Sequence, residues 1–349
     1  MELTQVKRII IINLGGIGDI LLSTPALRAL KQQFPQSEMS ILIFRQSYAA
    51  VTGLPYIENI LCLEHGLRVT ALCKNLLVVW KLRKRHFCLA VNMRTMLSQR
   101  SAGKVKVLLD IINPGIKAGR DTEGRGSFLD IKIPETERGE KYEMEYDIEI
   151  ARALGAEVKD RNIDFEIEPV AIEKVNKLLS EHGVLPQDLV IGIHPGGKPS
   201  HRWPLEDFSR VIDEISKRID CKFIATGSHD ETALGERLKV EAKGKLINFS
   251  GRLTLKELGA FIKRCSVYIC NDTAPMHIAA LLKVPMVALF TAGYLTRFDP
   301  RHISDKAIVL QSNAECAPCD KVTCSSLKCL VAITPEEVVQ AVTLLLDKK

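Results

Sequence analysis

Two strand-to-helix turns carry the residues of this chain that are best suited to chemistry. The first follows the apolar run 9–12 and reads Asn13-Leu14-Gly15-Gly16-Ile17-Gly18-Asp19. The second follows Cys270 and reads Asn271-Asp272-Thr273-Ala274, with His277 one helical turn further on. The N–H groups and the positive dipole end at such a helix start favour a phosphate or a carboxylate. The two turns predict an enzyme with two α/β domains that acts on a phosphorylated donor.

Asp19 is the candidate catalytic residue of the first turn. Its carboxylate is expected at the exposed lip of the turn, where it could accept the proton of an attacking hydroxyl group. Aspartate is also a common capping residue, so helix capping is an open alternative. The turn lacks the last glycine of a dinucleotide fingerprint, since Leu21 stands there, and the second strand ends at Arg45 instead of an acid. A nicotinamide-dependent dehydrogenase is therefore a weak alternative.

A glycine-rich loop in the second half could bind a diphosphate. The apolar strand 189–194 is followed by Pro195-Gly196-Gly197 and then by Lys198, His201 and Arg202. Glycine lets the backbone approach a ligand, and cations suit a leaving pyrophosphate. The alternative is an ordinary basic loop.

Other polar residues of the second half also have two explanations. Gly227 follows the next strand, and Glu231 after it could hold ribose hydroxyls or complement a helix dipole. Asp272 and Thr273 could act as helix caps only, and His277 could be a core residue. Their place beside a predicted anion-binding helix start favours donor binding.

Strand-like and helix-like segments alternate along both halves, which predicts parallel sheets covered by helices. In the first half we expect strands at 8–12, 40–44 and 87–92, helices at 19–34, 69–85 (buried, with a basic end) and 143–154, and a loop over 121–138. In the second half we expect strands at 189–194, 222–226, 267–270 and 284–290, and helices at 171–181, 205–218, 255–263, 274–282 and 334–346. The expected domains are 1–168 and 169–349, with the last helix able to pack back on the first domain.

Length and charge limit the class of protein. A chain of 349 residues is long enough for two domains with separate cores. The formal charge of +6 suits a phosphorylated substrate or an anionic membrane surface, and no platform of interleaved aromatic and basic residues predicts a nucleic acid partner. No apolar run is long enough for a membrane span or a signal sequence, so we expect a cytoplasmic protein.

Two further segments leave alternatives open. Cys316, Cys319, Cys324 and Cys329 are spaced closely enough for a structural zinc site, and reduced thiols or local disulfides are the alternative. The basic run 81–86 ends an expected helix of the first domain. It could contact anionic lipid headgroups, or it could be a solvated helix end that complements the dipole.

The ordered set of motifs resembles the ADP-heptose:lipopolysaccharide heptosyltransferases, which form glycosyltransferase family nine. The motifs are 13–19 with 23–27, 194–196 running to 202–204, and 271–280 with 284–285, and the resemblance extends from about Lys7 to Val342. It implies a GT-B fold, in which two Rossmann-like doubly wound domains face a central cleft. The first domain would bind a lipid-linked oligosaccharide acceptor and the second a nucleotide-sugar donor.

The resemblance also implies a reaction. It is the inverting transfer of heptose or a related sugar from an ADP-sugar to the lipopolysaccharide inner core, without a metal or another cofactor, at the inner face of the cytoplasmic membrane. Asp19 matches the base, residues 196–202 and 272–277 match the diphosphate cradle, and Glu231 matches a ribose-binding acid. On the acceptor side we place Gly15, Gly16, Gly18, Arg45 and Arg94.

Three positions depart from the family pattern. His201 stands where lysine is usual, Ala274 where glycine is usual, and Thr291-Ala292-Gly293 where Gly-Pro-Thr is common. These departures leave open a GT-B protein of altered specificity, or one that binds a sugar nucleotide without turnover.

Overall fold

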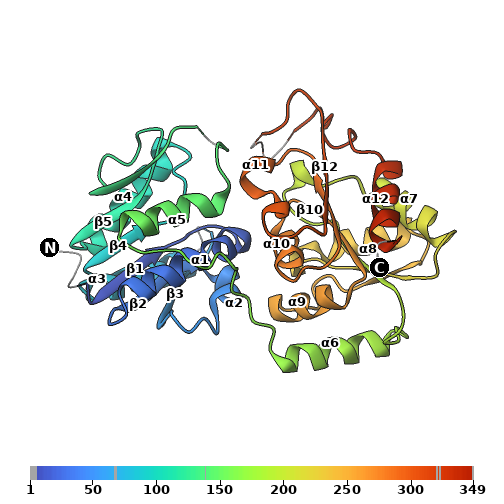
Figure 1. Cartoon of the computed structure of the whole chain (residues 1–349), viewed down its shortest axis with the longest axis horizontal. Coiled ribbons are helices and arrows are strands. Elements are labelled where there is room, and N and C mark those ends of the chain that lie inside the picture. The colour runs from blue at the N-terminus through green and yellow to red at the C-terminus, as the bar shows by residue number, and fades with distance from the viewer. Residues whose placement is uncertain (1–5, 67–68, 138, 320, 322–323, 348–349) are drawn as a thin grey trace. The chain divides into compact units, whose positions relative to one another are not determined.

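The chain divides into two compact units, Met1–Phe165 and Glu166–Lys349. The structure is a computed structural model, and it describes residues 6–66, 69–137, 139–319, 321 and 324–347 (Figure 1). The division falls three residues before the boundary expected from the sequence. None of the helices in these described ranges is long and apolar enough to cross a membrane.

The amino-terminal unit is built on a parallel sheet. Its described strands lie in the order β3-β2-β1-β4-β5-β6, and every pair is parallel. The chain winds from β1 to one side and then crosses to the other side at β4, so the loops after β1 and β4 open side by side at the carboxyl edge, where doubly wound sheets bind ligands. The elements are β1 (Arg8–Ile12), α1 (Ile17–Gln33), β2 (Glu38–Phe44), α2 (Tyr48–Val51), β3 (Asn59–Leu63), α3 (Val69–Arg83), β4 (Leu89–Asn92), α4 (Gln99–Ile112), β5 (Ile116–Thr122), β6 (Ile131–Glu135) and α5 (Glu143–Ala153).

Two pairs of helices cover this sheet. Helix α1 packs against α5 and α3 against α4, and Figure 1 shows the pairs on opposite faces. Ile10 and Ile12 of β1 pack with Leu82 of α3 and Leu109 of α4. Alternate side chains of a strand point to opposite faces, which explains why the whole run 9–12 is buried.

The carboxy-terminal unit repeats the same topology. Its described strands lie in the order β12-β11-β10-β7-β8-β9, again with parallel pairing. The first strand of the unit, β7, is central, and the loops after β7 and β10 open side by side. The elements are α6 (Pro169–Glu181), β7 (Val190–His194), α7 (Leu205–Ser216), β8 (Lys222–Ala225), α8 (Thr232–Glu241), β9 (Leu246–Asn248), α9 (Leu255–Arg264), β10 (Val267–Asn271), α10 (Ala274–Leu281), β11 (Met286–Phe290), α11 (Leu295–Phe298), β12 (Ala307–Gln311) and α12 (Pro335–Asp347).

The helices of this unit also form two layers. Helix α12 packs on α7 and on β10 to β12, and α7 packs on α8. Their apolar side chains form one core with Trp203, which is 1% exposed. Helix α9 packs against both α6 and α10.

Two expectations about local structure are wrong. The expected loop 121–138 contains the end of β5 and all of β6; residue 138 itself lies outside the described residues. Strand β6 lies at one edge of the described sheet, where it pairs only with β5. It carries Pro134, a residue that sheets tolerate at their edges. The helix expected to be buried at 69–85 is α3, and only Ala71 and Leu82 of it are buried.

A buried ion cluster joins β5 to α5. Arg120 is 0% exposed and donates from Nη1 to Glu143 Oε1 at 2.7 Å and from Nη2 to Asp147 Oδ1 at 2.6 Å. Burial disfavours the charged guanidinium, but Glu143 and Asp147 outweigh it and raise the pKa of Arg120. Burial also raises the pKa of the Asp147 carboxyl, and Arg120 opposes that effect. Each charge therefore depends on the others to remain inside the protein.

Removal of Arg120 is predicted to destabilise the amino-terminal unit. In Arg120→Met two buried carboxylates lose their cation, which typically costs about 3–5 kcal/mol. The matched control is Lys106→Met, because Lys106 and Asp110 form an exposed pair worth about 1 kcal/mol or less. Urea unfolding of the full chain, followed by circular dichroism, measures both changes. Equal changes in the two variants would contradict this account of the cluster.

Candidate active site

Asp19 is held at the start of α1 by two partners. Its Oδ2 accepts the N–H of Gly16 at 2.8 Å, and its Oδ1 lies 2.7 Å from Arg94 Nη1. Arg94 follows β4, so the pair bridges the two loops that open side by side. The Asp19 side chain is 17% exposed, and it therefore caps the helix and stays accessible at the same time.

The turn before Asp19 requires glycine at position 15. A Cβ on Gly15 would lie 2.8 Å from Arg94 Nη1 and 2.8 Å from Asp19 Cβ, closer than real contacts allow. The Gly15 N–H donates to Asn13 Oδ1 at 3.2 Å, and Asn13 Nδ2 donates to Ser23 Oγ at 2.8 Å. Gly18 lies within the first turn of α1. The turn is thus fixed by the side chain of Asn13 after β1 and by those of Asp19 and Ser23 in α1.

The ion cluster supports both sides of the Asp19–Arg94 pair. Ser23 Oγ lies 2.6 Å from Asp147 Oδ2 and 2.8 Å from the carbonyl oxygen of Asp19. On the other side, Arg120 Nη1 donates to the hydroxyl of Thr95, the neighbour of Arg94, at 3.2 Å.

Arg45 does not join this group. Its Nε lies 3.6 Å from Glu64 Oε1, its side chain is mostly exposed, and its guanidinium lies over the ring of Tyr48.

In the second unit Glu231 holds the glycine-rich loop. Its Oε1 accepts the Gly197 N–H at 2.8 Å and lies 3.3 Å from Arg202 Nη2, and its Oε2 accepts the Ser228 N–H at 2.9 Å. Burial raises the pKa of this carboxyl, but the hydrogen bonds from Ser228 and Gly197 prevail and lower it overall. Glu231 is therefore a charged brace of the loop that binds backbone groups.

Close backbone approach explains the glycines of this loop. A Cβ on Gly196 would lie 2.4 Å from Glu231 Oε1, and Gly197 has a φ of +118°. A Cβ on Gly227, after β8, would lie 2.9 Å from the Ser250 hydroxyl.

Asn271, the last residue of β10, connects this strand to the glycine-rich loop. It is not among the predicted site residues. Its Nδ2 donates to the carbonyls of Pro195 and Gly196 at 3.1 and 3.0 Å, and its Oδ1 accepts the Trp203 N–H at 3.1 Å. Its position at the end of the central strand β10 was the available signal.

The start of α10 lies at the end of the same strand. Thr273 precedes the helix, and its hydroxyl bonds to the carbonyl of Asn271 at 3.2 Å instead of capping the helix. Ala274 is the first helical residue, and His277 is buried with its ring edge-on to Phe298. A Cβ on Gly293 would lie 2.1 Å from Asp272 Oδ2. The loop after β11 therefore needs glycine beside Asp272.

The comparison with known proteins identifies the family. Residues 79–330 match the family described as glycosyltransferase family 9 (heptosyltransferase). The chain belongs to glycosyltransferase family 9. It is 24% identical over 337 residues to lipooligosaccharide heptosyltransferase 2 of Campylobacter jejuni subsp. jejuni serotype O:2, covering 93% of each chain.

Two solved structures show the fold of this family 9 enzyme. The glycosyl transferase family 9 protein from Veillonella parvula DSM 2008 matches with a TM-score of 0.77, 22% identity and 98% of each chain covered. The E. coli heptosyltransferase WaaC with ADP matches with a TM-score of 0.67 and 15% identity, over 97% of this chain and 99% of that one. The predicted family and GT-B fold class are confirmed, and the dehydrogenase alternative is set aside.

His201, at the position where the family resemblance predicts a lysine, is buried in this enzyme. Its Nδ1 lies 2.8 Å from Ser200 Oγ, and its Nε2 lies 3.2 Å from the carbonyl oxygen of Cys319. Burial, with a contribution from Lys198, lowers the pKa of His201. A neutral ring is therefore favoured here, and the exposed cation of the loop is Lys198.

The cysteine cluster of the family 9 chain consists of free thiols. Cys316, Cys319, Cys324 and Cys329 all lie in the described part of the chain, and none is in a disulfide. Within that part, no group of three or more His, Cys, Asp or Glu side chains is placed to hold a metal ion. Hydrogen bonds from Ser326 and Leu327 lower the pKa of Cys324 to about 7.

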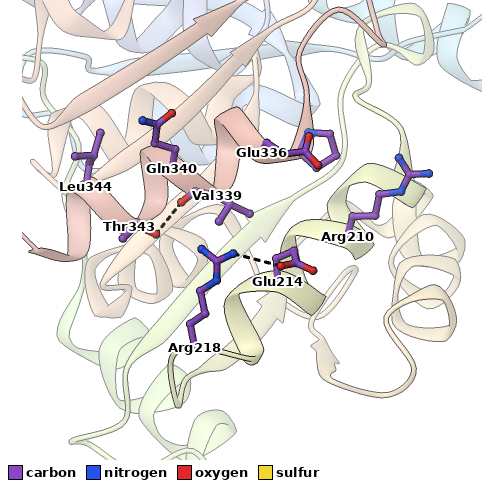
Figure 2. Close-up of a pocket in the computed structure, with 9 residues that line it drawn as sticks. Arg210, Glu214, Arg218, Glu336, Val339, Gln340, Thr343 and Leu344 are labelled. Atoms are coloured by element: carbon purple, nitrogen blue, oxygen red, sulfur yellow. Dashed lines mark hydrogen bonds and ion pairs between the residues drawn. The ribbon is translucent and has the colours of Figure 1, made fainter.

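A separate cavity lies between α7 and α12 (Figure 2). It measures about 480 Å³, and Figure 2 shows Glu214 of α7 and Arg218 just after this helix across from Val339 and Thr343 of α12. None of the predicted site residues lines it. It therefore adds nothing to the candidate active site.

His194, at the end of β7, forms a buried chain under the glycine-rich loop. Its Nδ1 lies 3.1 Å from Thr226 Oγ1, which lies 2.8 Å from the hydroxyl of Tyr268. Its Nε2 lies 4.0 Å from Glu231 Oε2. Burial lowers the pKa of His194 to about 4, so the ring is neutral at neutral pH.

This neutral histidine predicts a loss of stability in mild acid. Between pH 6.5 and 4 the unfolded chain protonates His194 and the folded chain does not, so the free energy of unfolding falls by about 3 kcal/mol from this group. His194→Asn should remove that part of the pH dependence, whereas His229→Asn, at an exposed position, should not. Urea unfolding from pH 7 to 4.5 measures both slopes. An unchanged slope in His194→Asn would contradict this account, because it would mean that the ring takes up its proton in the same pH range in the folded enzyme as in the unfolded chain.

Proposed function

We propose that this family 9 enzyme transfers heptose, or a related sugar, from an ADP-sugar to an inner-core lipopolysaccharide acceptor. The observation that carries the proposal is the accessible carboxylate of Asp19 at the carboxyl edge of one sheet, matched by a braced, glycine-rich loop with cations at the equivalent edge of the other. The relative from C. jejuni is named a lipooligosaccharide heptosyltransferase, and the structural relative WaaC was solved with ADP. Both support this substrate class.

In the proposed reaction Asp19 is the base. It accepts the proton of the acceptor hydroxyl while that oxygen attacks the anomeric carbon, the bond from this carbon to the diphosphate oxygen breaks, and ADP leaves. Attack opposite the leaving group inverts the anomeric configuration. Arg94, already paired with Asp19, would orient the acceptor beside the Gly15–Gly18 turn.

The donor would be held by the second unit. Lys198 and Arg202 would meet the charge that develops on the leaving diphosphate, together with the start of α10 at Thr273 and Ala274. Glu231 is already hydrogen-bonded to the loop. A carboxylate has about four acceptor positions, and those of Glu231 are used by two N–H groups, by Arg202 and by the Ser228 hydroxyl. A ribose hydroxyl would therefore replace the Ser228 hydroxyl on Glu231. No step of the proposed reaction needs a metal or a cofactor.

The proposal includes a lipid-linked oligosaccharide acceptor. Such an acceptor is anchored in a bilayer, and an ADP-sugar is a water-soluble donor. The proposed place of action is therefore the inner face of the cytoplasmic membrane, with the enzyme in the cytoplasm and in peripheral contact with anionic lipid.

The variant Asp19→Asn tests the role of the base. Asparagine keeps an oxygen that can accept the Gly16 N–H but cannot accept the proton, so kcat should fall by about 10²–10⁴-fold. Binding of ADP, measured by calorimetry, should stay unchanged. The rate is measured by release of ADP with an inner-core acceptor and a panel of ADP- and UDP-sugars.

Three results would contradict the proposal. Equal rates in the wild type and in Asp19→Asn would remove Asp19 from the reaction. Absence of transfer with every donor, with ADP binding retained in both proteins, would favour the sugar-nucleotide-binding protein without turnover. Faster transfer from UDP-sugars than from ADP-sugars would favour altered specificity.

The variant Glu231→Gln tests the brace. A neutral amide binds the two N–H groups more weakly than a carboxylate does, and it attracts Arg202 less. We expect KM for the donor to rise at least about tenfold, the equivalent of 1.4 kcal/mol, with a smaller change in kcat. The control is Glu236→Gln, on the exposed side of α8. A fall in kcat with KM unchanged would contradict a role in donor binding.

A further inference from the structure

The positive charge of this chain is concentrated in one segment. Between Glu64 and Asp110 the sequence contains ten lysines and arginines and no aspartate or glutamate. Because the formal charge of the whole chain is only +6, the rest of the chain is net acidic. The segment contains α3, β4 and most of α4. A surface formed by it attracts anions, in contrast to the remainder of the molecule.

Helix α3 exposes an apolar face in this basic segment. The side chains of this face, which we call the α3 face, are all more than one third exposed and follow helical spacing: Val69, Leu72, Leu76, Leu77 and Trp80. Leu76 is 69% exposed and Trp80 is 54% exposed. The opposite side of the helix, at Ala71 and Leu82, is buried. The core of the unit therefore uses one apolar side of α3 and leaves the other in water.

Basic side chains surround the α3 face. Lys74, Lys81 and Lys84 are exposed on or just after the same helix, and Lys84 Nζ lies 3.5 Å from the centre of the Trp80 ring. The neighbouring helix α4, which packs on α3, adds exposed Lys104 and the exposed apolar side chain of Val107. Exposed apolar side chains next to lysines, with a tryptophan among them, are the composition of helices that lie in the membrane interface.

We propose that the α3 face docks this enzyme on an anionic lipid bilayer. The apolar side chains would enter the boundary between headgroups and acyl chains, and the lysines would contact lipid phosphates. Charge disfavours a symmetric contact with a second copy of this chain, because that contact would bring two surfaces of the same sign together. The inference deepens the proposed function, on which its biological purpose rests, by naming the surface that meets the lipid of the acceptor.

The two tryptophans of the chain provide a direct test. Trp203 is 1% exposed in the core, so a change in tryptophan emission on lipid addition reports on Trp80. Vesicles of phosphatidylcholine with one third phosphatidylglycerol should shift the emission to the blue, and brominated lipids should quench it. Vesicles of phosphatidylcholine alone should bind the full chain at least about tenfold more weakly, since each basic residue near an anionic surface contributes about 1 kcal/mol.

Paired variants separate the apolar and the charged contributions in a flotation assay. Leu76→Ser with Leu77→Ser, and Lys81→Glu with Lys84→Glu, should each lower binding to the anionic vesicles at least about tenfold. Matched controls are Val240→Ser, the most exposed large apolar residue of α8 at 77%, and Lys239→Glu beside it. Both controls should bind like the wild type. Circular dichroism checks that every variant is folded.

Several outcomes would overturn the inference. One is equal binding by the wild type and both α3 variants, and another is equal binding to neutral and anionic vesicles. A third is self-association of the wild type in the absence of lipid that Leu76→Ser abolishes, since it would assign the face to a second copy. The lipid assay needs no sugar transfer, so it can succeed where the proposed reaction fails. With a delipidated, water-soluble acceptor the α3 variants should keep the wild-type kcat/KM.

Discussion

The amino-terminal unit depends on one buried cation. Arg120 is placed inside the fold against the carboxylates of Glu143 and Asp147, an arrangement that is costly unless every partner is present. The same cluster reaches Asp19 through Ser23 and the loop of Arg94 through Thr95. Electrostatic pairing that holds β5, α5 and α1 together therefore also fixes the two loops whose side chains form the Asp19–Arg94 pair. Stability and the geometry of the candidate base have the same origin in this unit.

The carboxy-terminal unit reaches a comparable result with different residues. Its sheet has the same winding order, and its glycine-rich loop follows the central strand β7 as the Asp19 turn follows β1. Here the loop is fixed by a partly exposed carboxylate, Glu231, and by the amide of Asn271. Beneath it His194 stays neutral because it is buried. In both units glycine allows the backbone to approach, and a polar side chain from a neighbouring element determines where the loop lies.

The sequence predicts this fold well where strands are buried on both faces, and poorly elsewhere. The runs that became β1, β7 and β11 are continuous and apolar, so only a covered parallel strand fits them. Strand β6 reads Ile-Lys-Ile-Pro-Glu. This segment is too short and too polar for its hydrophobic periodicity or its composition to distinguish it from a loop. Helix α3 was recognised as a helix, but its sequence is apolar on two sides and cannot tell which side meets the core. In the candidate site, motif order indicated Asp19 and the Gly196–Arg202 loop. The buried state of His201 and the use of Glu231 as a brace depend on contacts far apart in the chain.

Among the described residues, the groups that hold the Asp19 turn and the glycine-rich loop each belong to the same unit as the loop they hold. The partners of the Asp19 turn come from α1, α5 and the β4 loop, and those of the glycine-rich loop come from β10 and from the segments after β8 and β11. Such self-contained bracing means that a change in one loop leaves the hydrogen bonds that hold the other loop in place.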